Sequence, residues 1–216
     1  MSLIADDRTN RIATPQVFER VAKLLKVEDF EPVLTFLVTK ACLDQNQEVR
    51  EAGSKAAVAI IKAQSERHAN AILAILESFL DAEDGLAAKE ESKNQACILL
   101  GTLAPFLHET SQKKLITTFD KLIELAYGCQ SEMVRRSICK CIPQLSRYFP
   151  DKSKGYLQAQ LKALKESEVQ TELKGIAFVV AGLLKAQGMK VLNEMDIVGS
   201  LGREFFTGKK ADPVRK

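Results

Sequence analysis

Residues 134–149 read VRRSICKCIPQLSRYF, and their apolar positions recur at the spacing of one helical face. Counting from Val134, the residues four, seven, eleven and fifteen positions on are Ile138, Cys141, Leu145 and Phe149. An α-helix has 3.6 residues per turn, so these offsets fall on one side of it. The stretch therefore predicts an amphipathic helix that buries this side.

The same pattern occurs in three further places, which start at Val49, Ser92 and Val169. Every residue at the four offsets is small or apolar, with the exception of Gln64. These residues are Gly53, Ala56, Ile60 and Gln64 in the first copy, Ala96, Leu99, Leu103 and Leu107 in the second, and Leu173, Ile176, Val180 and Leu184 in the fourth. The starts are 43, 42 and 35 residues apart, and Val214 would open a fifth copy. A period of about 40 residues is typical of HEAT repeats.

A second apolar helix is expected between successive copies. The expected ranges are 33–43, 68–80, 114–127, 156–164 and 195–206. One such helical hairpin cannot bury both of its apolar faces, so neighbouring hairpins must stack. We predict an all-α fold, a HEAT/armadillo-type α-α superhelix, in which residues 1–216 form a single array cut from a larger solenoid. The repeats are expected at about 29–65, 66–108, 110–149 and 151–187, with a partial repeat at 188–216.

In this fold, six residues of the apolar columns should be buried between helices: Leu99, Leu103, Ile138, Leu145, Ile176 and Val180. Glycines inside the expected helices, Gly53, Gly175 and Gly182 among them, are explained best by a close approach of two helices. Glycine costs about 1 kcal/mol relative to alanine in a helix, so such positions need a packing reason.

Composition excludes several classes of protein. No apolar run approaches the roughly 20 residues of a membrane-spanning helix, and the amino terminus lacks the layout of a secretory signal. The five cysteines, Cys42, Cys97, Cys129, Cys139 and Cys141, are odd in number and lie within apolar helical patterns. We therefore expect reduced structural thiols, with Cys141 in the core, and no metal, cofactor or catalytic site. The default location is the cytoplasm.

The charge is unevenly distributed along the chain. The net charge is only +3, yet residues 1–108 carry 12 Lys and Arg against 16 Asp and Glu, whereas residues 109–216 carry 19 against 12. The second half is therefore the basic half. An ordinary solvated surface or an anionic partner can each account for this imbalance.

A mostly basic column follows the first position of each copy: Arg50, Lys93, Arg135 and Gln170, with Arg215 beginning the next. One interpretation is a structural ladder whose members pair with acids such as Asp44, Glu132 and Asp212. The other is a basic stripe that contacts ribosomal RNA or an acidic protein. The candidate contact residues are Lys113, Lys114, Arg135, Arg136 and Lys174.

Several stretches resemble a known family. They are CIPQL at 141–145, ELKGIA at 172–177, AGLLKAQG at 181–188, ILLGTLA at 98–104 and ESFLD at 77–81. They are similar to the central HEAT region of the very large translational activator of the general amino-acid-control pathway. Leu173 stands where that family has arginine.

The resemblance implies a scaffold without catalytic activity. Members of the family bind ribosomes together with an ABC-type ATPase and relay the uncharged-transfer-RNA signal to the kinase of initiation factor 2. The matching region is associated with ribosome contact, and the kinase binds further toward the carboxyl terminus. A nuclear-transport receptor or a phosphatase scaffold subunit remains an alternative on the same fold. A HEAT-like DNA glycosylase would need a strongly basic groove with aromatic residues, which a chain with no tryptophan and a net charge of +3 does not indicate.

Overall fold

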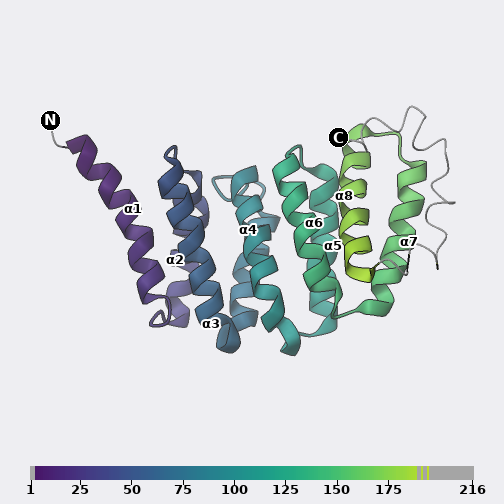
Figure 1. Cartoon of the computed structure of the whole chain (residues 1–216), viewed down its shortest axis with the longest axis horizontal. Helices are drawn as coiled ribbons and strands as arrows, with labels where there is room; N and C mark the ends of the chain where they lie inside the picture. Colours follow the sequence, from purple (N-terminus) through teal and green to yellow (C-terminus); the bar gives the residue numbers. More distant parts are fainter. Residues whose placement is uncertain (1–2, 189–190, 192–193, 195–216) are drawn as a thin grey trace. The chain divides into compact units, whose positions relative to one another are not determined.

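The computed structural model describes residues 3–188, 191 and 194, with side chains from Thr9 onward (Figure 1). The described part contains eight α-helices and two short 3-10 helices and no strand. The predicted all-α HEAT-type fold is thereby confirmed. The expected helix at 195–206 and the fifth copy at Val214 lie outside the described residues.

The chain divides into two compact units, Met1–Glu109 and Thr110–Lys216. That the repeats form one continuous array stays a prediction. The elements of the first unit are α1 (Leu3–Val21), α2 (Val27–Thr39), η1 (Ala41–Leu43), α3 (Gln47–Asp81), α4 (Glu90–Leu103) and η2 (Ala104–Glu109). Helix α3 packs against α1, α2 and α4 and so forms the centre of this unit.

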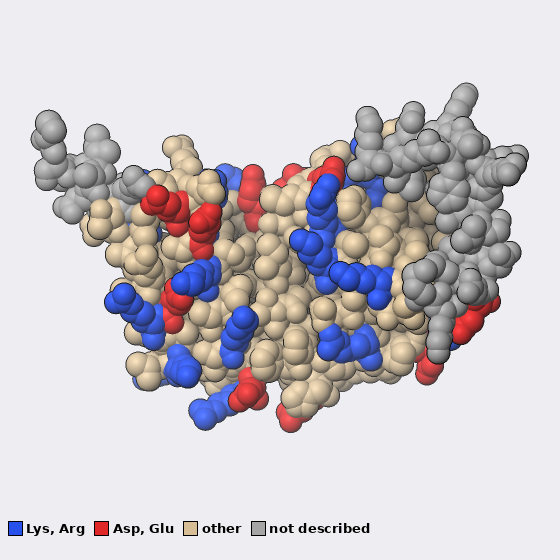
Figure 2. Space-filling view, viewed as in Figure 1, with Lys and Arg blue, Asp and Glu red and all other residues tan. Residues whose placement is uncertain are grey.

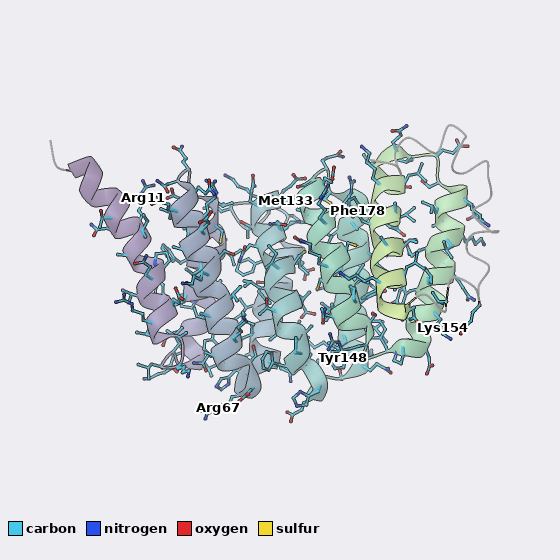
Figure 3. The ribbon with its side chains drawn as sticks, viewed as in Figure 1. Arg11, Arg67, Met133, Tyr148, Lys154 and Phe178 are labelled. Carbon is cyan, nitrogen blue, oxygen red and sulfur yellow. The ribbon has the colours of Figure 1, made fainter. Side chains whose placement is uncertain are left out.

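Helix α3 joins the two helices that the sequence pattern predicts on either side of residue 67. His68 interrupts it with non-helical backbone angles, φ −132° and ψ 21°. The imidazole ring of His68 packs edge-on against Phe30, with 5.4 Å between ring centroids. Arg67, next to this break, lies at the lower edge of the ribbon in Figure 3.

The second unit contains α5 (Gln112–Gly128), α6 (Glu132–Ser146), α7 (Pro150–Glu166) and α8 (Gln170–Gln187). Helix α8 packs against α6, α5 and α7. Ser111 and Ser131 cap α5 and α6, because their hydroxyls accept hydrogen bonds from the amides of Lys114 and Val134. The predicted second helices at 114–127 and 156–164 lie within α5 and α7.

Two helices at the beginning of the chain differ from the prediction. Helix α2 begins at Val27 and ends at Thr39, and the expected range 33–43 therefore includes the separate 3-10 turn η1. Helix α1 was not predicted at all, because its residues are mostly polar and show almost no apolar periodicity. Its contact with α3 stabilises it through tertiary packing.

The register of the fourth copy was wrong by three residues. The residues that precede α3, α4, α6 and α8 are Asn46, Lys89, Ser131 and Val169. Val49, Ser92 and Val134 each stand three positions into the helix, so the equivalent residue in α8 is Glu172, and Val169 lies before the helix. Residues three apart share a helical face, which is why the alignment from Val169 also gave apolar columns. The basic column therefore meets Leu173 in α8 rather than Gln170.

The predicted core is confirmed. The six residues Leu99, Leu103, Ile138, Leu145, Ile176 and Val180 are at most 6% exposed. Gln64, the one polar residue in the columns, is also buried, and its side-chain amide donates to the carbonyls of Ala22 and Leu25 at 2.7 and 3.2 Å. These two hydrogen bonds satisfy backbone carbonyls in the segment that follows α1, so a polar residue fits this core position.

Glycine allows helices of the second unit to approach closely, as expected. A Cβ atom on Gly175 would lie 2.2 Å from the carbonyl oxygen of Ala126 in α5. A Cβ atom on Gly182 would lie 3.0 Å from the carbonyl oxygen of Cys139 in α6. Helix α8 therefore lies directly against both helices of the preceding hairpin.

Candidate interaction surface

Arg135 is a buried structural residue. It is only 2% exposed, although it carries a full positive charge. Its guanidinium donates to the carbonyl oxygens of Ala126 at 3.1 Å, Thr171 at 3.0 Å and Cys129. These carbonyls belong to the end of α5, the loop after it and the first turn of α8. Arg135 thus connects three elements and is not available to a partner, which corrects its inclusion among the candidate contact residues.

Two members of the basic column, Arg50 and Arg135, have structural partners, but these are carbonyls rather than the expected acids. Arg50 donates to the carbonyl oxygens of Asp44 and Gln45, both at 2.8 Å. The Asp44 carboxylate instead pairs with Arg11 of α1 at 2.8 Å. Carbonyls near helix ends lack intrahelical donors, and a guanidinium offers several donors in a fixed plane, so an arginine suits this position. The proposed partner Asp212 lies outside the described residues.

Arg136 and Lys174 are exposed, unlike their neighbour Arg135. The guanidinium of Arg136 pairs with Glu132 one turn earlier in α6, and Nε lies 2.8 Å from the carboxylate. Both side chains of this pair are more than half exposed, at 64% and 54%, so the pair contributes little to stability. Lys174 lies in the second turn of α8, close to the end that Arg135 joins to α6.

Lys113 and Lys114 lie at the opposite end of the unit. Both belong to the first turn of α5, and the neighbouring Gln112 donates to the carbonyl of Tyr148, just after α6. Figure 3 shows Met133 and Tyr148 at the two ends of α6. Helix α5 has 17 residues and is therefore about 25 Å long. The candidate residues thus do not form one patch.

Sequence reasoning missed two lysines that lie between these ends. Lys140 of α6 and Lys185 of α8 are exposed, and both act electrostatically on the thiol of Cys139. Burial raises the pKa of Cys139, and the two ammonium groups oppose this rise. Two cations from different helices thus act on the same thiol. The signal in the sequence was the absence of any carboxylate after Glu132 in α6 and after Glu172 in α8.

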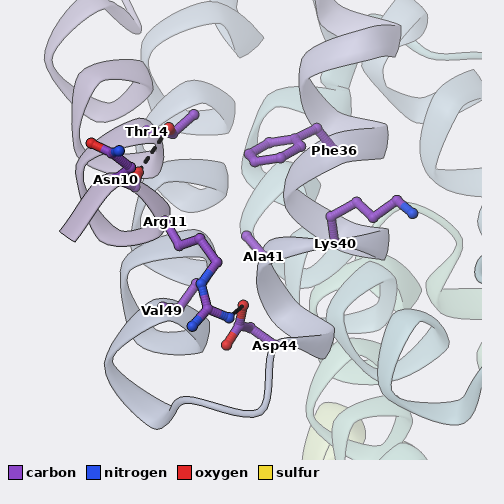
Figure 4. Close-up of a pocket in the computed structure, with 8 residues that line it drawn as sticks. All are labelled: Asn10, Arg11, Thr14, Phe36, Lys40, Ala41, Asp44 and Val49. Carbon is purple, nitrogen blue, oxygen red and sulfur yellow. Dashed lines mark hydrogen bonds and ion pairs between the residues drawn. The ribbon is translucent and has the colours of Figure 1, made fainter. Parts of the chain in front are cut away.

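The first unit contains an open pocket of about 410 Å³ between α1, α2 and the start of α3 (Figure 4). Phe36, Ala41 and Val49 supply its apolar lining. The Asp44 carboxylate at its edge is satisfied by Arg11 and by the amide of Asn46, both at 2.8 Å. The pocket therefore combines this apolar lining with the side chains of Asn10, Thr14 and Lys40.

The thiols are suited to packing rather than to chemistry. Burial raises the pKa of Cys42 and of Cys141 to about 12, so both remain protonated at neutral pH. All five cysteines are free. In the described part, no group of three or more His, Cys, Asp or Glu side chains could hold a metal ion. None of the described helices is long and apolar enough to cross a membrane.

Helical hairpins that pack against their neighbours, with the buried Arg135 joining two of them, are the features of a HEAT-type repeat fold. A family model described as the HEAT repeats of the stalled ribosome sensor GCN1 matches residues 3–105. No solved structure matches the chain.

Proteins from distant eukaryotes show the same relationship. The human stalled ribosome sensor GCN1 is 28% identical over 182 residues, which is 84% of this chain. The eIF-2-alpha kinase activators GCN1 of Dictyostelium discoideum and Saccharomyces cerevisiae are 27% and 29% identical over 89% and 84% of the chain. The chain is thus similar to a stretch of the GCN1 proteins over most of its own length. It spans about 7% of the length of each of these relatives.

Proposed function

We propose that this chain is a non-catalytic HEAT-repeat scaffold segment of a ribosome-associated translational activator. In this function it would help to activate the kinase of initiation factor 2 during amino-acid starvation. The observation that carries the proposal is the similarity to GCN1 proteins, which extends over 84–89% of the chain. The relatives are named for sensing stalled ribosomes and for activating the eIF-2-alpha kinase. The same similarity favours this function over that of a nuclear-transport receptor or a phosphatase scaffold.

Tyr156, whose pKa is raised, has a structural role, and this supports a scaffold rather than an enzyme. The Tyr156 hydroxyl donates to Asp120, and its ring packs against Phe119 and Phe149. Burial and the neighbouring carboxylate raise the pKa of this tyrosine. Such a hydroxyl remains protonated and joins α7 to α5. In an active site, shifted groups would be expected to gather in a cleft.

The partners follow from the proposed membership in a large cytoplasmic assembly. The ribosome is the partner that we assign to this segment, whereas the kinase and an ABC-type ATPase are assigned to the full-length protein. Four basic residues of the second unit are the proposed contacts: Lys113, Arg136 and Lys174, which are exposed, and Lys114, which is half-buried. Arg135 is replaced in this role by its exposed neighbours, because its guanidinium is buried.

Ribosome co-sedimentation tests the proposal. The chain is centrifuged with purified ribosomes through a sucrose cushion at salt concentrations between about 50 and 200 mM. Binding through phosphate contacts should be strongest at the lowest salt and fall steeply over this range. A chain that stays in the supernatant at every salt concentration would exclude ribosome contact by this segment.

A further inference from the structure

The exposed side of α6 is rich in basic residues. Residues 3, 4, 4 and 3 positions apart follow one face of this helix, and they are Met133, Arg136, Lys140, Gln144 and Arg147. Three of these five side chains are cations, and none is an acid. Arg136, Lys140 and Arg147 are all exposed.

The exposed side of α8 is also basic. Its face contains Lys174, Phe178, Ala181 and Lys185, which are 4, 3 and 4 positions apart. Both lysines are exposed, and Phe178 is half-buried between them. Figure 3 shows Phe178 on α8 on the side of α6.

Direct contacts join the two faces into one surface. Gly182 brings α8 against the backbone of Cys139, and Arg135 ties the first turns of the two helices together. Lys140 follows Cys139 directly in α6, and Lys185 lies one turn after Gly182 in α8, so both are near this contact. Packed helices are about 8–10 Å apart, so side chains from both can reach one ligand. Figure 2 shows the Lys and Arg side chains gathered over α6 and α8.

Helices α6 and α8 themselves contribute no acid along most of this surface. The only carboxylates of the two helices, Glu132 and Glu172, lie in their first turns. Glu132 pairs with Arg136, and Glu172 accepts a hydrogen bond from Ser167 at 2.9 Å. Lys140, Arg147, Lys174 and Lys185 thus form a row of cations that no acid of α6 or α8 interrupts.

The composition of the surface favours a nucleic acid over a protein partner. Lysine is depleted from protein–protein interfaces, whose centres are apolar, whereas two lysines lie at the middle of this surface. Interfaces with nucleic acids are more polar and strongly positive. Long lysine side chains are adaptable point charges that suit phosphate groups.

We propose that the exposed faces of α6 and α8 form one track for the phosphate backbone of RNA, with Lys140 and Lys185 at its centre. This inference rests on the proposed ribosome association and identifies where the chain would meet RNA. The track excludes Lys113 and Lys114, which lie at the far end of α5. Recognition is of phosphates and shape, without preference for sequence.

Fluorescence anisotropy with two labelled probes tests the track: an RNA duplex of 16 base pairs and a single-stranded 16-nucleotide oligouridine. If five cations contact the duplex, affinity should fall about 500-fold between 50 and 200 mM salt. The Lys140→Gln/Lys185→Gln variant removes two contacts, so the same salt change should lower its affinity only about 40-fold. At 50 mM salt the variant should bind about tenfold or more weakly than the parent. The relative affinities of the two probes distinguish helical from single-stranded RNA as the source of the phosphates.

A double variant with the same loss of charge serves as the control. Lys152→Gln/Lys162→Gln changes exposed lysines of α7. It should bind RNA within about twofold of the parent, and both variants should keep the melting temperature of the parent. An equal loss of binding in both variants would show non-specific attraction and overturn the track.

Two further results would also contradict the proposal: unchanged binding by Lys140→Gln/Lys185→Gln, or binding of a labelled polyglutamate peptide as tight as that of RNA. Ribosome co-sedimentation separates this inference from the proposed function. If the parent and the Lys140→Gln/Lys185→Gln variant sediment equally with ribosomes, the track is wrong while ribosome association stands. If the parent does not sediment at all, the proposed function fails.

Discussion

Replacing Arg135 by methionine would test the structural role of the buried arginine most directly. Methionine keeps the length and the apolar stem of the side chain but provides no donor for the carbonyls of Ala126, Cys129 and Thr171. A hydrogen bond from a charged group contributes about 1.5–3 kcal/mol, so three set an upper limit of about 5–9 kcal/mol. The change also removes a buried charge, and this recovers several kcal/mol of desolvation. We expect a net loss of about 3–5 kcal/mol in the free energy of unfolding.

The chain provides a convenient probe for this measurement, because it has no tryptophan and its three tyrosines, Tyr127, Tyr148 and Tyr156, all lie in the second unit. Urea unfolding followed by tyrosine fluorescence therefore reports on the unit that contains Arg135. Arg136→Met is the matched control, and it should cost less than about 1 kcal/mol because its ion pair is exposed. A loss below about 1 kcal/mol for Arg135→Met, or equal losses for both variants, would refute the structural role.

Two further predictions concern the core of the same unit. Leu145→Ala should lower the free energy of unfolding by about 2–5 kcal/mol, because Leu145 is fully buried and the cavity cannot collapse completely; a change below about 0.5 kcal/mol in urea unfolding would contradict its burial. Cys141 ionises with a pKa of about 12 in the folded chain against 9.0 when unperturbed, so its contribution to stability is complete below pH 9 and is lost as the pH rises toward 12. Between pH 9 and 10.5, urea unfolding followed by circular dichroism should show a steeper loss for the parent than for Cys141→Ala, by up to about 1.4 kcal/mol per pH unit. Equal losses of stability in the parent and in Cys141→Ala would show that burial does not keep this thiol protonated.

Helical periodicity was sufficient to predict the repeat helices and their buried face, because a helix that buries one face carries apolar residues every three to four positions. It was not sufficient where tertiary contacts decide the outcome. Gln64 looked like an exception in an apolar column, yet it is buried because the chain after α1 leaves two carbonyls to satisfy. Helix α1 shows little periodicity and is defined by its contact with α3. The three-residue error in α8 arose because a helix presents nearly the same face at both registers.

The candidate surface was harder to predict than the fold, because neighbouring residues have opposite environments. Arg135 and Arg136 are adjacent in the sequence, but a rotation of about 100° per residue buries one and exposes the other. Charge counting alone could select the basic half of the chain but could not make this distinction. Lys140 and Lys185 are 45 residues apart and become neighbours only through the packing of α8 on α6.

The loop that precedes α8, residues 167–169, illustrates the role of Arg135 by contrast. Leu173 occupies the position equivalent to Arg135 and is buried, so α8 has no guanidinium at this position. The loop is held instead by Ser167, whose hydroxyl donates to Glu172 and accepts from the amide of Val169 at 3.3 Å. These bonds are exposed and local, and they tie the loop only to the helix that follows it. The bonds of Arg135, by contrast, are buried and join α6 to the end of α5 and to the next hairpin. The stacking of α8 therefore depends on an arginine supplied by α6, while α8 offers only an apolar side chain at the corresponding place.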